Sequence, residues 1–438
     1  MKPKGLLIAV VLLAVLGGVT WWSNKNQADK AKAPADATTK LLTIPDDQFQ
    51  EIKIKKVTDE VLSLKRENGK WQMTAPKPMA ADQDAAGSMV SALANLNADK
   101  VVEEKATDLK PYGLDIPTLD VQIVRKDGKT DHLLIGDDTL NGTGAYAKLA
   151  NDAKVVTVGT MTKTGLDKRP DDLRDKRLLT FDSDKLSRVE LAAKGPAIEF
   201  GKNGQNEWQI VKPRPLRADG SAVDSLVSKL KDAKMDLSAP DPTKDAAKQF
   251  AAATKVATVT VTDAGGTQTI EVRRDKDKNV FAKSSAVEGL YKTNADLADA
   301  LEKSVDDFRN KKVFDFGFSD PSRVEVKGVG YTKAGDKWTA NGKTMDNASV
   351  QTLIDKLRDL AATKFAEKGG GEPVMVASVV SNSGKRNEKV SISKLGTQYF
   401  AQRDGEPSIY ELDTKVVEEL QKAASDVKEA PPEQPKKK

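Results

Sequence analysis

Apolar residues fall on alternate positions at the start of each of three long stretches of the chain, which is the pattern of a half-buried β-strand. Phe49, Ile52 and Ile54 open the first stretch, and Val189 and Leu191 open the second. Each pattern leads to a second predicted strand, which contains a tryptophan. These tryptophans are Trp71, Trp208 and Trp338.

Downstream of each tryptophan, apolar residues recur three, four and seven positions apart, so they share one face of a helix. Such a face packs against a sheet. The three apolar stripes are Met89, Leu93 and Leu96; Val223, Leu226, Val227 and Leu230; and Val350, Leu353, Ile354 and Leu357.

A hairpin is predicted after each helix, because further alternating residues are interrupted by a turn sequence. The turns are expected at Asp127–Gly128, at Gly265–Gly266 and near Gly384. This order of elements predicts α+β units, each an antiparallel sheet with helices. The alternating residues are Leu119, Val121, Ile123, Leu133 and Ile135 in the first hairpin, Ala257, Val259 and Val261 in the second, and Val374 and Val376 in the third.

A signature that recurs at an offset of 137 residues indicates that the units are copies of one another. Its prolines cannot donate to a sheet ladder and so end the tryptophan strand, and its aspartate lies where a helix N-cap belongs. A repeat of this length predicts one domain copied in tandem. The signature is Trp71, Pro76, Pro78 and Asp82 in the first copy and Trp208, Pro213, Pro215 and Asp219 in the second, and a worn third copy starts at Trp338.

Three related domains are therefore expected, at 41–177, 178–312 and 313–425, the third shortened. The junction segments 171–191 and 306–326 match at nine of 21 positions. Such a link favours successive domains that meet with a fixed geometry, as in an extended rod; alternatively, the matched residues only close each domain's own core. The junction residues singled out are Arg174, Phe181 and Arg188, with their counterparts Arg309, Phe316 and Arg323.

Residues 5–22 form one apolar run between a basic N-terminus and a polar stretch. In a helix, eighteen residues reach about 27 Å, close to the hydrocarbon thickness of a bilayer. We expect a transmembrane anchor with residues 1–4 in the cytoplasm and the rest of the chain exported. A cleaved signal peptide is the alternative, which the length of the run and Trp21–Trp22 disfavour.

The segments that flank the predicted domains contain too few apolar residues to fold. Residues 23–40 are expected to be a flexible tether and residues 426–438 a disordered tail.

Composition narrows the function classes. The 70 basic and 65 acidic residues leave a net charge of only +5, with no long block of one sign, which argues against nucleic acid binding. The absence of cysteine excludes disulfides, thiolate nucleophiles, cysteine metal sites and a lipoprotein signal. His132 is the single histidine, so a zinc site is not expected, nor is any other metal or cofactor.

Three segments resemble functional motifs only in part. Gly136–Tyr146 lacks the phosphate-loop pattern, Asp275–Asn279 lacks the glycine and glutamate of a calcium loop, and Asp315-Phe316-Gly317 has no kinase partner motifs. The repeated tryptophans are interpreted as core residues, with exposed ligand platforms as the alternative. No catalytic residue is assigned.

The tryptophan strand that runs through P-x-P to Asp82, the segment Tyr112–Pro117, Ile135-Gly136-Asp137 and the LRDK segment at 173–176 together resemble a bacterial family. It is catalogued as domain of unknown function 4340. The resemblance covers nearly all of the chain beyond the tether, but the third copy lacks P-x-P.

Members of that family are typically membrane-anchored proteins encoded beside ABC-transporter permeases and a gliding-motility-type auxiliary protein. The resemblance therefore implies a non-enzymatic accessory or scaffold subunit, held in the bacterial inner membrane by 5–22, with such a permease or auxiliary protein as its partner. The alternative is an extracytoplasmic binding protein for a glycan, lipid or peptide. A hydrolase with paired carboxylates is disfavoured, because no spacing singles out a pair.

Overall fold

Three antiparallel sheets, each with helices against it, make up the computed structural model, which describes residues 39–58, 60–239, 241–318 and 321–431. The α+β prediction is therefore confirmed. The chain divides into two compact units, one that ends at Lys176 and one that begins at Arg177. The first unit holds the first sheet, and the second unit holds the second and third sheets; we call the three sheets with their helices the first, second and third repeats.

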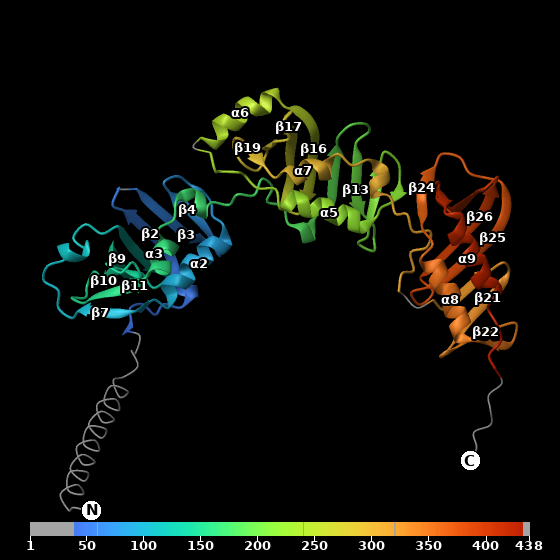
Figure 1. The fold of residues 1–438 in the computed structure, drawn as a ribbon, viewed down its shortest axis with the longest axis horizontal. Coiled ribbons are helices and arrows are strands. Elements are labelled where there is room, and N and C mark those ends of the chain that lie inside the picture. Colours follow the sequence, from blue (N-terminus) through green and yellow to red (C-terminus); the bar gives the residue numbers. More distant parts are fainter. Residues whose placement is uncertain (1–38, 59, 240, 319–320, 432–438) are drawn as a thin grey trace, which may run out of the picture. The chain divides into compact units, whose positions relative to one another are not determined.

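The first repeat is built on a nine-stranded sheet. The helices α2 (Gln83–Ala94), α3 (Thr160–Leu166) and α4 (Pro170–Leu173) accompany it, with α2 and α3 on one face (Figure 1). A separate pair, β1 (Thr39–Lys40) and β6 (Asn97–Ala98), closes the start of the repeat. In sheet order the strands are β5 (Met79–Ala80), β4 (Lys70–Ala75), β3 (Val61–Glu67), β2 (Phe49–Lys56), β8 (Leu119–Arg125), β9 (Thr130–Asp138), β10 (Gly144–Leu149), β11 (Val155–Gly159) and β7 (Lys100–Glu103).

The second repeat has an eight-stranded sheet, with α5 (Gly220–Lys231) and α7 (Ala295–Leu301) against one face. The added helix α6 (Pro242–Ala252) packs on Phe281, whose strand neighbours face the main core, so α6 covers part of the opposite face. The strands are β15 (Leu216–Arg217), β14 (Trp208–Lys212), β13 (Ile198–Lys202), β12 (Arg188–Ala192), β16 (Thr254–Asp263), β17 (Gly266–Arg274), β18 (Val280–Ser284) and β19 (Leu290–Thr293).

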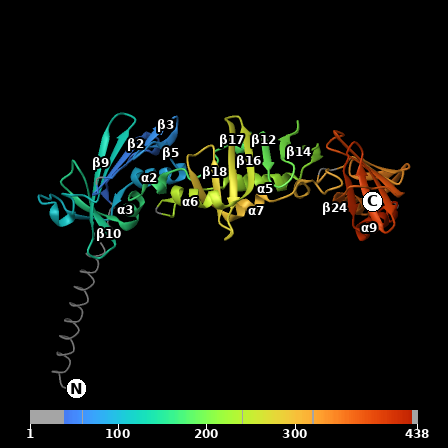
Figure 2. The ribbon, with the colours of Figure 1, turned by 90° about the horizontal axis from the view of Figure 1, so that it is seen from above.

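The third repeat returns to nine strands, and α8 (Asn347–Arg358) and α9 (Thr414–Ser425) share its core. Figure 1 labels both helices, and Figure 2 shows α9 from a second direction. It is shorter in sequence but keeps the strand order of the first repeat's nine-stranded sheet. The strands are β23 (Lys343–Met345), β22 (Lys337–Ala340), β21 (Val329–Ala334), β20 (Arg323–Val326), β25 (Glu372–Ser381), β26 (Arg386–Leu395), β27 (Gln398–Arg403), β28 (Ile409–Leu412) and β24 (Ala362–Ala366).

Each repeat has a hydrophobic core of its own, formed where the helical stripes meet one sheet face. All predicted stripe residues are buried, including Leu96, which lies just beyond the end of α2. Phe49 and Ile52 both face the core although they are three residues apart, because a β-bulge interrupts the register between them.

Two strand predictions need correction. The tryptophan lies on the third strand of each main sheet along the chain, because β3, β13 and β21 lie between the first strand and the tryptophan strand. In the third hairpin the residues that face the core are Met375, Ala377 and Val379, whereas Val376 is exposed. Val374 packs against the core as expected, but after the register shift between Pro373 and Met375 the core-facing residues are Met375 and every second residue that follows, so Val376 points away from the core.

The signature aspartates cap the central helices as predicted. Asp82 accepts from the amides of Asp84 and Ala85, Asp219 from that of Ala222, and Asp346 plays the same role in the third repeat. The prolines also act as expected, since β4 ends before Pro76 and β14 before Pro213.

The third repeat lacks P-x-P because its loop is a two-residue turn. Asn341 and Gly342 adopt positive φ values of 49° and 77°, the backbone that a tight hairpin requires. This turn makes the path from Trp338 to the capping Asp346 three residues shorter than the equivalent path in the other repeats.

In each repeat, the helix that follows the tryptophan strand is the central helix: α2, α5 or α8. A segment near the end of the repeat returns to the start of this helix and bonds to its capping aspartate, and we call this contact the closure of the repeat. The amide of the capping aspartate donates to the carbonyl of Leu173 in the first repeat, of Phe308 in the second and of Lys428 in the third, each at 2.8 Å. The third repeat therefore extends past Ser425, where we expected the disordered tail to begin. Met345 pairs with Glu429, and Ala430 donates to Thr344.

The predicted cytoplasmic residues 1–4, the anchor 5–22 and most of the tether 23–40 lie outside the described residues. Thr39 and Lys40, the last of the tether, pair as β1. Within the described ranges, no helix is long and apolar enough to span a membrane.

Replacement of Asp219 by alanine removes the acceptor for the Ala222 amide and is expected to destabilise α5 by about 1 kcal/mol. Hydrogen exchange of the α5 amides should then be about fivefold faster wherever it proceeds through opening of this helix. Asp219→Asn, which keeps a capping oxygen, should exchange close to the wild-type rate. Equal rates in the two variants would contradict the capping role.

Candidate functional site

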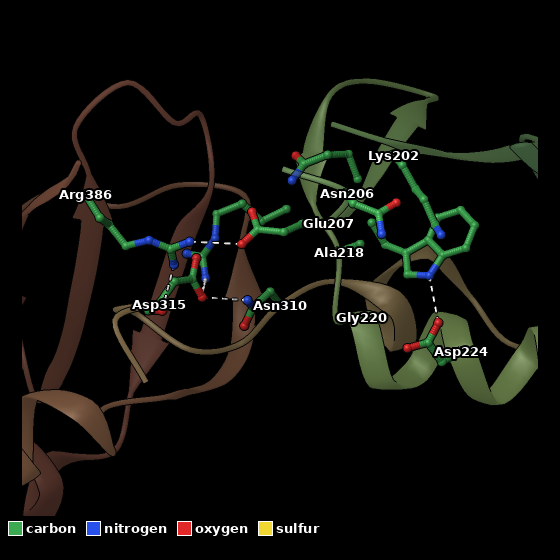
Figure 3. Close-up of a pocket in the computed structure, with 12 residues that line it drawn as sticks. Lys202, Asn206, Glu207, Ala218, Gly220, Asp224, Asn310, Asp315 and Arg386 are labelled. Carbon is green, nitrogen blue, oxygen red and sulfur yellow. Dashed lines mark hydrogen bonds and ion pairs between the residues drawn. The ribbon is translucent and has the colours of Figure 1, made fainter. Parts of the chain in front are cut away.

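A polar cavity of about 450 Å³ lies inside the second unit, where the second and third repeats meet (Figure 3). The second repeat contributes the end of β13, the start of β14 and the start of α5, and the third repeat contributes Asp315 and Arg386. Its size is within the range of small-ligand sites, but its lining is charged rather than apolar.

Trp208 forms one wall and is only 7% exposed. Its indole N–H donates to Asp224 on α5 at 2.8 Å, and the Lys202 ammonium lies 5.0 Å from the ring centroid. The indole is thus fixed between a carboxylate and a cation, which suits a rigid wall.

The residue after the capping aspartate differs between the repeats, and the second repeat, which borders the cavity, is the one without a side chain there. In the first repeat it is Gln83, whose Oε1 accepts from the main-chain amide of Trp71 at 2.8 Å and whose Nε2 donates to the Trp71 carbonyl at 2.9 Å. In the third it is Asn347, which accepts from the amide of Trp338 at 3.2 Å. We call this contact the amide clamp. In the second repeat the position is Gly220, which has no side chain to form it.

An ion pair between the repeats borders the cavity: Arg386 of β26 donates to Glu207 at 2.9 Å (Figure 3). Arg386 also donates to the main-chain carbonyl of Asp315 at 2.7 Å. A hydrogen bond with Asn203, opposed by partial burial and reinforced by Arg386, holds the pKa of Glu207 below its usual range. Glu207 is half exposed, so this pair contributes little to stability.

Arg217 forms the buried part of the contact between the second and third repeats, with 11% of its side chain exposed. Its guanidinium donates to Asp315 at 2.8 Å, to the carbonyl of Lys312 at 2.7 Å and to the hydroxyl of Tyr410 at 3.2 Å. One side chain of the second repeat is therefore bonded to two groups of the third, Asp315 and Tyr410, and to the segment that links the two repeats. Burial of both ions makes the loss of either partner costly.

Further charged groups surround Arg217 on the third repeat. Burial, with a contribution from Glu406, raises the pKa of Tyr410 to about 12. Burial disfavours the charge of Arg403, but Glu406, Asp315 and Glu388 raise its pKa overall. Tyr410 therefore stays protonated, and Arg403 stays charged, across the physiological pH range.

The residues predicted from the repeat junction separate into three groups. Arg309 joins the polar network: it is buried, donates to Ser408 at 3.0 Å and stacks on Phe365. Phe181 and Phe316 belong to the cores of their repeats. The others pair with nearby carboxylates: Arg174 with Asp171, Arg188 with Glu190 and Glu199, and Arg323 with Glu325.

The predicted signature residues lie in the cores, the loops and the helix caps of the repeats, and Trp208 also lines the cavity. Trp71, Trp208 and Trp338 are 6%, 7% and 4% exposed and belong to the three cores. Pro76, Pro78, Pro213 and Pro215 lie in the loops after the tryptophan strands. Sequence reasoning missed Arg217, Arg386 and Gly220; only Gly220 carried a signal, since it stands where the first copy has Gln83.

Other candidate chemistry has little support in the described residues. The sole histidine, His132, contacts Asp120 through Nε2 at 2.5 Å, and both lie on adjacent strands of the first sheet. Among the residues that the structure describes, no group of histidine, aspartate and glutamate has the arrangement of a metal site.

A family model described as Domain of unknown function (DUF4340) matches residues 71–207 and again residues 208–377. The chain belongs to this family. Both matches to the DUF4340 model start at a signature tryptophan, so they follow the repeat that the structure contains. Neither the curated proteins nor the solved structures contain a match to the chain.

Replacement of Arg217 by methionine should destabilise the second unit by about 3 kcal/mol, because it leaves the partly buried Asp315 without its main cation. Urea unfolding of the full chain measures the loss. Arg214→Met, at an exposed loop position of the same segment, is the matched control and should change stability by less than about 0.5 kcal/mol. Similar losses in both variants would show that Arg217 does not secure the junction.

Proposed function

We propose that this protein is a non-enzymatic accessory or scaffold subunit of an ABC-transporter-linked envelope system. Residues 5–22 would anchor it in the bacterial inner membrane, and the three repeats would be extracytoplasmic. The apolar run, the basic N-terminus and family membership support this proposal.

The observation that carries the scaffold role is the charged junction between the second and third repeats. The two repeats have separate hydrophobic cores, yet Arg217 and Arg386 join them through polar contacts. Separate cores allow each repeat to present its own surface, and the buried arginine favours one arrangement of the two. A protein that holds partners in register needs both properties.

The second candidate is a binding protein, and the cavity beside Trp208 favours it. The charged lining suits a polar ligand such as a peptide or glycan and disfavours the lipid considered from the sequence. A binding protein in this position would present its ligand to the same membrane partner.

Affinity purification of the full-length chain in mild detergent, with mass spectrometry of the co-purifying proteins, tests the scaffold proposal. We expect ABC permease or ATPase subunits to be recovered. A chain that begins at Lys40 places the contact: recovery with full-length protein alone assigns it to the anchor, and recovery with both assigns it to the repeats. Recovery of no transporter subunit with either chain would reject the proposal in favour of the binding protein.

A further inference from the structure

The three repeats share the backbone arrangement at the start of the central helix, but they differ in the side chain that follows the capping aspartate. In the first repeat the carboxamide of Gln83 makes three hydrogen bonds: it accepts from the Trp71 amide, and it donates to the carbonyls of Trp71 and Ala81 at 2.9 and 2.8 Å. In the third repeat the carboxamide of Asn347 bonds the amide of Trp338 and the carbonyl of Asp336. Two of the three sites are thus filled by a primary carboxamide.

The second repeat keeps the groups that the clamp would bind. Trp208 pairs with Lys202 as Trp71 pairs with Arg66, so its main-chain amide points to the same side of the strand. Ala218 stands where Ala81 stands in the first repeat, and it lines the cavity. A Cβ placed on Gly220 would meet no atom within 4 Å, so no neighbour fills the position where the missing side chain would begin.

The main-chain groups that the clamp would bind in the second repeat determine which chemical group can replace it. An occupant must accept from the Trp208 amide and donate to a neighbouring carbonyl from the same side. A primary carboxamide has its C=O and one N–H on the same side, as in Gln83. A trans secondary amide, whether peptide or N-acetyl, has them on opposite sides, and a carboxylate has no donor.

The rim of the cavity indicates where such a carboxamide comes from. Lys202, Glu207, Asp224 and Arg386 surround it with both signs of charge, which matches a polypeptide with polar and charged neighbours rather than a neutral sugar. We propose that the cavity beside Trp208 binds the side chain of an asparagine or glutamine from a partner polypeptide, in the way that Gln83 fills the first repeat. This deepens the proposed function and rests on it for the identity of the partner.

Selective labelling of tryptophan with ¹⁵N provides the test, because the chain has only five tryptophans and one lies at each of the three sites. The full-length protein in detergent is titrated with N-acetyl-glutamine methylamide at millimolar concentrations. We expect a saturable downfield shift of the Trp208 main-chain amide and no shift at Trp71 or Trp338. The matched glutamate compound has the same two secondary amides but no carboxamide, and it should have no effect.

Two variants complete the test. Gly220→Gln should shift the Trp208 amide downfield without ligand, slow its exchange with water and abolish the response, whereas Ser221→Gln at the exposed neighbouring position should respond like wild type. Gln83→Gly should make Trp71 responsive.

The proposal is overturned if glutamine and glutamate compounds act alike, if Trp208 does not respond, or if Gly220→Gln still responds. The titration contains no transporter subunit, so its failure and the failure of the purification experiment are distinguishable.

Discussion

The closure of each repeat over the start of its central helix is the constraint on which the architecture depends. The helix must lie on the sheet to bury its apolar stripe, but its first amides and the adjacent strand edge are then left at a boundary that needs polar partners. The capping aspartate satisfies the helix through its side chain and binds the returning segment through its main-chain amide. The segment at the end of the repeat is thereby hydrogen-bonded to the capping aspartate. This contact explains why the aspartate and the junction segment recur together.

The same closure relates the repeated junction residues to the contacts between the second and third repeats. In the second repeat the carbonyl of Phe308 completes the closure, and only five residues later Val313 donates to Leu360 to begin the third repeat. Arg309 and Asn310 therefore lie between two main-chain anchors, and their side chains enter the polar network. The repeated residues close each domain's core through the phenylalanines and also join the second repeat to the third through the arginine.

The sequence predicted those features that depend on local patterns. Helical stripes, N-caps and proline-ended strands each need only a few neighbouring residues, and all were confirmed. The errors came from long-range contacts. A bulge after Pro373 puts Met375 instead of Val376 on the core side of β25, and the pairing of Glu429 with Met345, together with packing of Val427 on the core, orders residues that composition predicted to be disordered. The cavity was not predictable, because Arg217 and Arg386 have no distinguishing pattern and acquire their role only where two repeats meet.

The common fold explains the features that the three repeats share. A difference between them, such as Gly220 in place of Gln83 and Asn347, therefore needs a separate explanation. The amide clamp gives the tryptophan amide a side-chain acceptor in the first and third repeats, and Gly220 offers no such acceptor beside the cavity in the second. This difference lies next to the charged junction, where a partner contacting both repeats would arrive. The first and third repeats make this contact with a side chain of their own, and the second lacks that side chain beside the cavity, so an external carboxamide could take the place there that Gln83 and Asn347 take in the other copies.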